Sequence, residues 1–309
     1  MQTHTMKTFL TLAAFAFGLA GPLAADAHAA QPIPTVVFQS DFGLSDGAVA
    51  AMWGVAHEVD RDLFLANLSH EVPQFDIWVG AYFLSQTAPY WPAGTVFVSV
   101  VDPGVGTERK SVVLKTKSGH YFVTPDNGTL TLVADQLGVA EVREIDEAVN
   151  RRADSTQSYT FHGRDVYAYT GARLASRTIT FDEVGGSLGQ KILRLDYAEA
   201  KIADGQLTGN VDILDFRYGN VWTNIDRATF LELTPAFGQN FTVTITQNGK
   251  TIYQGSIPYQ PTFGEVPEGR PLIYLNSLNR VALALNQGNF AATHDIGYGA
   301  GWQITLTPQ

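Results

Sequence analysis

Four short polar clusters contain the residue types best suited to chemistry, and each is bounded by glycine or proline. They are SDFGLSDG at 40–47, VVDPGVGTERK at 100–110, TPDNGTLT at 124–131 and FHGRD at 161–165. Turn residues of this kind let a ligand approach the backbone and present the neighbouring polar side chains. Carboxylate, guanidinium and imidazole groups can together bind a polar substrate and transfer protons.

The first cluster follows a predicted strand and precedes a predicted helix. Asp41 stands at the carboxyl end of the strand, where open α/β sheets bind their ligands, and Asp46 opens the helix. A carboxylate at this place can accept hydrogen bonds from both hydroxyls of a ribose. The same residues fit a strand-to-helix turn in which an aspartate serves as the cap. This motif alone leaves both interpretations open.

The other three clusters are similarly ambiguous when each is taken alone. Asp102 ends a predicted strand close to Arg109, so the two can form a structural ion pair or a polar pair facing a ligand. The cluster at 124–131 favours a structural turn. His162 precedes a glycine and a predicted helix; an isolated histidine is most often structural, and catalysis is the alternative.

A further polar group follows in the second half of the chain, within LDFRYGNVWTNI at 214–225. Its polar and aromatic members are Asp215, Tyr218, Asn220, Trp222 and Asn224. Aromatic rings beside an amide and a carboxylate suit a purine or another polar planar ligand. Ser277 follows a later apolar strand. The sequence has no HExxH, Walker A, GxGxxG or GxSxG motif, and no histidine pair with metal-ligand spacing, so we expect no metal site.

Composition narrows the classes of protein. The chain has 309 residues, 45% of them hydrophobic, which suits two globular domains. Acidic residues outnumber basic ones by 30 to 20, and this balance argues against a nucleic-acid-binding protein, which needs a basic surface. Cysteine is absent, which excludes disulfides, thiolate metal sites and cysteine nucleophiles.

Residues 1–30 have the pattern of a secretory signal peptide. Lys7 precedes an apolar run at 9–20, and small residues follow up to a cleavage site near Ala29 or Ala30. Met6 is an alternative start, and a buried N-terminal helix is the alternative interpretation. No later segment is long and apolar enough to span a membrane. We therefore expect an exported, periplasmic protein with no membrane insertion after cleavage.

Apolar periodicity predicts two kinds of architecture. In the first part, strands and helices alternate, which indicates an α/β layer with a mostly parallel sheet flanked by helices. The predicted helices are 45–59 with Ser45 as N-cap, 75–90, 130–137 and 164–175; the predicted strands are 36–38, 63–68 and 95–101, with a hairpin around Ser118-Gly119.

The composition changes after about Asp196. Alternating apolar stretches and an Asn248-Gly249 turn predict an antiparallel barrel or sandwich. We expect an α/β domain over 31–196 and an all-β domain over 197–309.

Taken in order, the motifs resemble the S-adenosyl-L-methionine (SAM) hydroxide adenosyltransferase family, whose relatives include SAM-dependent fluorinase and chlorinase. The matching pieces are SDFGLSDG, DPGVGTERK, PDNGTLT, FHGRD, FRYGNVWTNI and YLNS. They extend from about Thr35 to the C-terminus. Each piece alone is weak, but their order across two domains makes the resemblance specific.

The resemblance implies a hydrolase that converts SAM to adenosine and L-methionine by attack of water at C5′. It implies no cofactor, because SAM is the substrate. It also implies a homotrimer in which each site lies between the N-terminal domain of one subunit and the C-terminal domain of a neighbour. The hydroxide-using branch carries an Asp-Arg-His set, which maps onto Asp102, Arg109 and His162. Family halogenases lack this set.

The substrate-binding residues follow by family position. Asp41 would bind the ribose hydroxyls, and Phe75 and Phe161 would line the adenosyl pocket. The neighbouring subunit would supply Tyr218 and Asn220 to the adenine, Asp215 to the methionine ammonium and Ser277 to its carboxylate; Asp46 and Trp222 complete the expected set. At position 278 halogenases carry an arginine for the carboxylate, and this chain has Leu278.

Three alternatives remain beside the hydrolase. An exported adenosyl- or nucleoside-binding protein would explain a signal peptide on a protein whose ligand is made in the cytoplasm. A SAM-dependent halogenase would form 5′-halo-5′-deoxyadenosine, but the Asp-Arg-His set weighs against it. A structural protein on an old enzyme scaffold fits least well with so many retained polar motifs.

Overall fold

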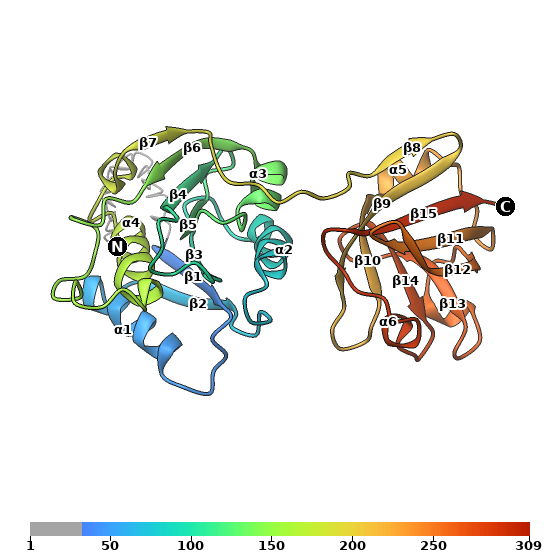
Figure 1. Cartoon of the computed structure of the whole chain (residues 1–309), viewed down its shortest axis with the longest axis horizontal. Helices are drawn as coiled ribbons and strands as arrows, with labels where there is room; N and C mark the ends of the chain where they lie inside the picture. The colour runs from blue at the N-terminus through green and yellow to red at the C-terminus, as the bar shows by residue number, and fades with distance from the viewer. Residues whose placement is uncertain (1–32) are drawn as a thin grey trace, which may run out of the picture. The chain divides into compact units, whose positions relative to one another are not determined.

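The computed structural model describes residues 33–309, and the predicted signal peptide and its cleavage site lie outside them (Figure 1). These residues form one compact unit that contains two sheets. Within this part of the chain, no helix combines the length and apolar character needed to cross a membrane.

The N-terminal sheet is seven-stranded, with the order β2-β1-β3-β5-β4-β6-β7. Its strands are β1 (Thr35–Ser40), β2 (Phe64–Ser69), β3 (Val96–Val100), β4 (Ser111–Thr116), β5 (Tyr121–Pro125), β6 (Val139–Glu144) and β7 (Ser187–Gly189). The expected parallel pairing holds for β2-β1-β3-β5, whereas β4, β6 and β7 pair antiparallel. The predicted hairpin around Ser118-Gly119 joins β4 to β5 and accounts for the first antiparallel pair.

Helices cover both faces of this sheet. They are α1 (Ala48–Val59), α2 (Ile77–Thr87), α3 (Thr131–Leu137) and α4 (Tyr169–Ala175), with a π-helical turn η2 (Gly163–Ala168) leading into α4 and short 3-10 turns η1 (Ala88–Tyr90) and η3 (Phe181–Val184). Val36 and Phe38 of β1 pack with α1 and α4, while Val37 packs with α2 and α3. Every residue of β1 is therefore buried, as expected for a parallel strand covered on both faces.

Helix starts differ from the prediction at several points. The helix expected from Phe75 begins at Ile77, with Asp76 as its N-cap. Helix α1 begins at Ala48, so Ser45 is not its N-cap. The Asp46 carboxylate accepts a hydrogen bond from the Ala48 amide at 2.9 Å, at the point where the helix begins. The helix predicted over 164–175 begins as the π-helical turn η2. Farther along, Gly171 lets α4 approach β3, because a Cβ there would lie 2.5 Å from Val98.

The C-terminal sheet is eight-stranded and antiparallel, with the order β12-β11-β15-β9-β10-β14-β13 and β8 beside β9. Its elements are β8 (Lys201–Ala203), β9 (Gln206–Leu214), β10 (Val221–Asp226), α5 (Arg227–Leu231), β11 (Asn240–Gln247), β12 (Lys250–Pro258), η4 (Phe263–Glu265), β13 (Pro271–Leu275), β14 (Arg280–Leu285), α6 (Phe290–Thr293) and β15 (Trp302–Pro308). A bridge between Tyr259 and Ile273 joins the two ends of the sheet into a near-barrel.

The barrel core and its turns follow the sequence pattern closely. Phe241, Val243 and Ile245 of β11 alternate inward and are fully buried. Asn248 and Gly249 have φ angles of 47° and 80°, which fits the predicted tight hairpin between β11 and β12. The predicted fold class, an α/β part followed by an antiparallel barrel, is confirmed. The expected domain boundary at 196/197 falls within 191–200, where the chain has neither helix nor strand.

Candidate active site

A cavity of about 330 Å³ lies beyond the carboxyl ends of β1 and β3. Six residues singled out from the sequence line it: Asp41, Asp46, Phe75, Asp102, Phe161 and His162. They come from the segments after two parallel strands, the loop before α2 and the start of η2, which are distant in sequence. The parallel strands bring them together because their carboxyl ends meet at one edge of the sheet.

Asp41 and Phe75 form one wall of this N-terminal cavity. The Phe75 amide donates to Asp41 Oδ2 at 2.9 Å. Phe75 has a φ of 66°, a left-handed conformation that strains a bulky residue, and its side chain is 68% exposed. A strained aromatic residue left open at a cavity wall is suited to contact a ligand.

Asp102 is bound tightly by Arg109 behind the cavity. Arg109 donates from Nε to both carboxylate oxygens at 2.9 and 3.1 Å, and from Nη2 to Oδ2 at 2.5 Å. Burial opposes the charge of Arg109, but hydrogen bonding to Asp102 and nearby negative groups outweigh it and raise the arginine pKa. Arg109 does not itself line the cavity, so it acts on any ligand there through Asp102.

The third cluster is a structural turn, as predicted, and it supports this pair. Asn127 donates through Nδ2 to the carbonyl of Val101 at 2.8 Å, and its Oδ1 accepts from Thr129. Asp126 accepts from the Leu193 amide at 2.8 Å. The turn therefore fixes the backbone immediately before Asp102.

His162 is 4% exposed and borders the cavity at the start of η2. Its Nε2 lies 3.2 Å from Nη2 of Arg151 and 3.7 Å from Oε2 of Glu147. Burial is the main cause that lowers its pKa, which keeps the imidazole neutral near pH 7. The side chains beside its Nε2 are Arg151 and Glu147, which no sequence motif had indicated.

Sequence reasoning missed four residues around this set: Ser111, Glu147, Arg151 and Tyr167. Tyr167 donates to Asp102 Oδ2 at 3.4 Å and lies under the Arg109 guanidinium. Glu147 and Arg151 belong to an irregular segment whose sequence has no periodicity to indicate which way their side chains point. No sequence signal could therefore have indicated Glu147 or Arg151.

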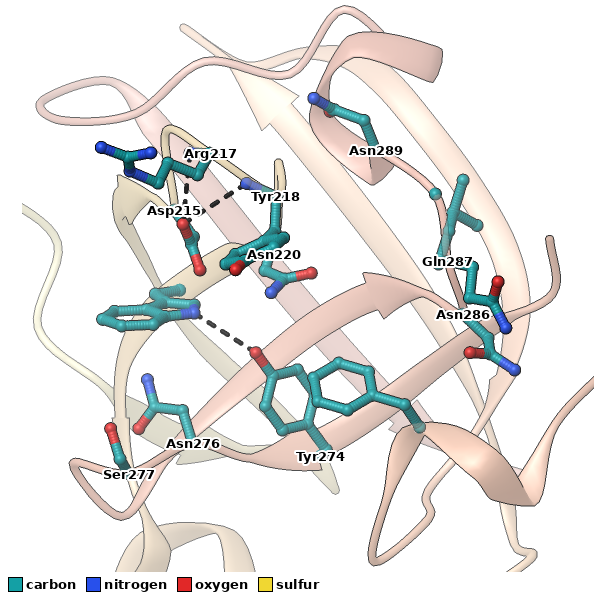
Figure 2. A pocket seen from close by; sticks show the side chains of 14 residues that line it. Asp215, Arg217, Tyr218, Asn220, Tyr274, Asn276, Ser277, Asn286, Gln287 and Asn289 are labelled. Carbon is teal, nitrogen blue, oxygen red and sulfur yellow. Dashed lines mark hydrogen bonds between the residues drawn. The ribbon is translucent and has the colours of Figure 1, made fainter. Parts of the chain in front are cut away.

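A second, larger cavity of about 810 Å³ lies in the C-terminal sheet (Figure 2). The predicted residues Asp215, Tyr218, Asn220, Trp222 and Ser277 line it, together with Phe263, Tyr274, Asn276 and the segment 285–289. Tyr274 and Asn276 belong to the YLNS motif, whereas sequence reasoning did not single out Phe263 of η4 or the segment 285–289.

A tight turn between β9 and β10 presents the polar residues of this C-terminal cavity. The Asp215 amide donates to the Asn220 carbonyl at 2.8 Å, and Asp215 Oδ1 accepts from the Tyr218 amide at 3.4 Å. Gly219 has a φ of 69° and lies against Asn289, so close that a Cβ would fall 1.8 Å from its Oδ1. Glycine is required here for the chain to turn and to meet α6.

The side chains of the C-terminal cavity suit a planar polar ligand. Tyr218 is 67% exposed, whereas Asn220 is 7% exposed. Trp222 donates to the Tyr274 hydroxyl at 3.3 Å (Figure 2). Asn224, which the motif placed with them, instead bonds the Asn210 amide and the Ala198 carbonyl and has a structural role.

The charged side chains that line the C-terminal cavity are Asp215 and Arg217. Leu278 lies outside its lining and packs in an apolar cluster with Val72 and Val101. Across residues 33–309, no group of three or more histidine, aspartate or glutamate side chains is arranged to hold a metal ion.

Comparison with known proteins finds matches to both parts of the chain. A model of the SAM hydroxide adenosyltransferase N-terminal domain matches residues 36–185, and a model of the corresponding C-terminal domain matches residues 209–303. An (R)-S-adenosyl-L-methionine hydrolase of Methanocaldococcus jannaschii is 37% identical over 63% of this chain and 69% of its own. A protein of the same name from Salinispora tropica is 34% identical over 89% of this chain and 98% of its own.

A fluorinase and a solved structure of an uncharacterized protein are also similar to this chain. A fluorinase of Nocardia brasiliensis is 28% identical over 88% of this chain and 97% of its own. A crystal structure of an uncharacterized conserved protein from Thermotoga maritima superimposes with a TM-score of 0.79 at 32% identity, over 88% of this chain and 99% of that one. The resemblance drawn from the motifs is confirmed, and the chain belongs to the SAM hydroxide adenosyltransferase family.

Proposed function

We propose that the protein hydrolyses SAM to adenosine and L-methionine by attack of water at C5′. The observation that carries the proposal is the buried Asp102–Arg109 pair beside His162 at one cavity. The relatives named hydrolases are 33–37% identical to the chain, and the fluorinases are 26–29% identical. The higher identity to the hydrolases favours water over halide as the nucleophile.

The reaction needs a positioned water more than a powerful base. The sulfonium is a good leaving group, because breaking the bond between C5′ and sulfur releases a neutral thioether. A water oxygen forms the new bond to C5′, and its proton passes to His162 and then to solvent. Asp102 accepts a hydrogen bond from the water, while the hydrogen bonds from Arg109 fix the direction of the Asp102 carboxylate. Holding the water in line with the C5′–S bond removes part of the entropic barrier.

Substrate binding is divided between the two cavities in this proposal. Asp41 and Phe75 of the N-terminal cavity would receive the ribose and one side of the adenosyl group. Tyr218 and Asn220 of the C-terminal cavity would bind the adenine, and Asp215 the methionine ammonium. Asp46, Phe161, Trp222 and Ser277 complete the proposed binding set.

We propose further that the site is completed between subunits of a homotrimer. The support is the exposure of Phe75 and Tyr218, since a cavity that binds an adenosyl group normally covers its aromatic rings. Sedimentation equilibrium would test the assembly. A trimer is expected, and a stable monomer with full turnover would contradict the shared site.

The central experiment follows product and oxygen origin. The chain from Gln31 onward is incubated with SAM in water enriched in oxygen-18, and products are separated with mass detection. We expect adenosine carrying the label in its 5′-hydroxyl, together with methionine. Unchanged SAM bound at one equivalent per chain would overturn the hydrolase and indicate a binding protein. A parallel reaction in high chloride or fluoride that gave 5′-halo-5′-deoxyadenosine would indicate a halogenase.

Export remains a proposal on the sequence pattern of residues 1–30. N-terminal sequencing of the protein from the periplasm of its host would test it. We expect a chain that begins near Gln31. A full-length chain retained in the cytoplasm would contradict the signal peptide.

A further inference from the structure

Glu147 connects the two halves of the proposed catalytic set. Its Oε2 accepts a hydrogen bond from Nη2 of Arg151 at 2.6 Å, and its Oε1 accepts from the Ser111 hydroxyl at 3.2 Å. Arg109 donates to the same hydroxyl through Nη1 at 3.1 Å. A continuous chain of hydrogen bonds therefore runs from the Asp102–Arg109 pair through Ser111 and Glu147 to Arg151.

Arg151 carries this chain to the imidazole. Its Nη2 lies 3.2 Å from Nε2 of His162, and its side chain is 4% exposed. The arginine also lies over the Tyr159 ring, 5.0 Å from its centre, which limits its movement. Glu147 Oε2 is 3.7 Å from the same nitrogen of His162. The Nε2 side of the ring is thus backed by one cation and one anion.

The other ring nitrogen, Nδ1, is buried and has no hydrogen-bond partner among residues 33–309. A buried polar atom without a partner is costly unless a ligand or water satisfies it. Arginine can only donate, so the 3.2 Å contact from Arg151 is a hydrogen bond only while Nε2 is unprotonated and the ring proton is on Nδ1. Nδ1 can accept a proton from a group in the cavity only in the other neutral form, in which Nε2–H faces Oε2 of Glu147 at 3.7 Å. The imidazolium then carries protons on both ring nitrogens, and its Nε2–H faces the negative charge of Glu147.

We propose that Glu147 is a positioning residue for the proposed reaction: its carboxylate faces Nε2–H of His162 so that Nδ1 can accept the proton, stabilises the imidazolium formed during the reaction, and through Ser111 connects it to the Asp102–Arg109 pair. This inference rests on the proposed function. It assigns a role to a residue that no sequence motif indicates.

The charges of Glu147 and Arg151 act on the pKa of His162 in opposite directions. Burial lowers the pKa of His162 most; the negative charges of Glu147 and Asp102 raise it, and the positive charges of Arg109 and Arg151 lower it. The rings of Tyr159 and Tyr167 also face it, each with its centre 6.4 Å away. Removing the charge of Glu147 lowers the pKa of His162, and removing that of Arg151 raises it.

The test compares pH profiles of kcat/KM for SAM in Glu147→Gln and Arg151→Gln. A histidine that accepts a proton must be neutral, so activity falls on the acidic side as it becomes protonated. We expect the acidic limb of Glu147→Gln to move to lower pH and that of Arg151→Gln to move to higher pH. We also expect kcat of Glu147→Gln to fall about 10- to 100-fold, part of what a positioned base supplies, with KM within about twofold.

Two further variants separate position from charge. Glu147→Asp keeps the charge and shortens the side chain, so kcat should fall while the acidic limb stays at the wild-type pH. Glu144→Gln is the matched control, because Glu144 pairs with Lys110 at the surface only three residues earlier. Its profile should equal that of the wild type. Coincident limbs in Glu147→Gln, Arg151→Gln and the wild type, or limbs that shift in the same direction, would overturn the inference.

A measurement without turnover keeps this inference distinct from the proposed function. The ring signal of His162 can be titrated by NMR in the wild type, Glu147→Gln and Arg151→Gln, with His162→Gln for its assignment. Opposite shifts of the titration midpoint are expected even if SAM is not the substrate, and equal midpoints would overturn the role. A wild-type enzyme that leaves SAM unchanged would instead contradict the proposed function. If Glu147→Gln does not fold, Glu147→Asp and Arg151→Gln still give both readouts.

Discussion

The two cavities of the molecule differ in how their polar side chains are satisfied. In the N-terminal cavity the ionisable groups bind one another: Asp102 and Arg109 have side chains only 5% and 11% exposed, and His162 is held by its neighbours. In the C-terminal cavity, aromatic, amide and hydroxyl groups surround a larger volume, and Tyr218 stands open to solvent.

This difference separates reaction from recognition. Groups that stabilise charge in a transition state must already be oriented, because reorganising them during the reaction costs free energy. Groups that select a ligand can remain open until it binds, since binding then covers their apolar surface and supplies their hydrogen-bond partners. The N-terminal cavity fits the first description and the C-terminal cavity the second. Substitutions in the two cavities should therefore change different kinetic quantities.

The largest expected effect is on turnover at the N-terminal cavity. His162→Ala should lower kcat about 10²- to 10⁴-fold, because it removes the proposed proton acceptor, and should leave KM within a few-fold. Steady-state kinetics with SAM measures both. Full turnover in a folded His162→Ala protein would show that the reaction does not use this histidine.

The next effect is on stability. Asp102→Ala leaves the buried Arg109 guanidinium without its partner, which should cost about 3–5 kcal/mol of unfolding free energy. Denaturant unfolding measures the loss. The double variant Asp102→Ala/Arg109→Met, which removes both charges, should recover most of it. An unchanged midpoint in the single variant would mean that the pair is not buried as described.

The C-terminal cavity should show the reverse pattern. Tyr218→Ala should raise KM for SAM about 5- to 150-fold, the equivalent of the 1–3 kcal/mol that stacking of a base on an aromatic ring contributes. Because Tyr218 is largely exposed, its unfolding free energy should change by less than about 0.5 kcal/mol. A variant that lost kcat with an unchanged KM would place Tyr218 in the chemistry and break the comparison.

The smallest effect concerns the methionine end of the substrate. Arg217 is the cation lining the C-terminal cavity, and position 278 is an apolar leucine, so Arg217 is the group available to the carboxylate. Arg217→Gln should raise KM for SAM by about two- to fivefold, as expected for an exposed ion pair. KM for decarboxylated SAM should be unchanged. Equal effects on both substrates would show that Arg217 does not contact the carboxylate.

The sequence predicted well wherever a local rule decides the structure. The carboxyl ends of β1 and β3 present Asp41 and Asp102 because parallel strands end at one edge. The Asn248-Gly249 hairpin follows from residues that accept positive φ. The start of α1 was missed because Asp46, rather than Ser45, accepts a hydrogen bond from the amide of the first helical residue. In the antiparallel half of the first sheet, the hairpin between β4 and β5 was predicted. The pairing of β6 and β7 was missed, because the direction of those strands depends on how the chain returns to the sheet.

The sequence by itself indicated the family, the two kinds of fold and the residues first assigned to the proposed site, since these depend on residue types in a fixed order. The tertiary structure alone decided which side chains are partners. It placed Glu147 beside Ser111, which is 36 residues away along the chain, and Arg151 beside His162. Partners of this kind come from irregular segments, where direction is set by packing and not by periodicity.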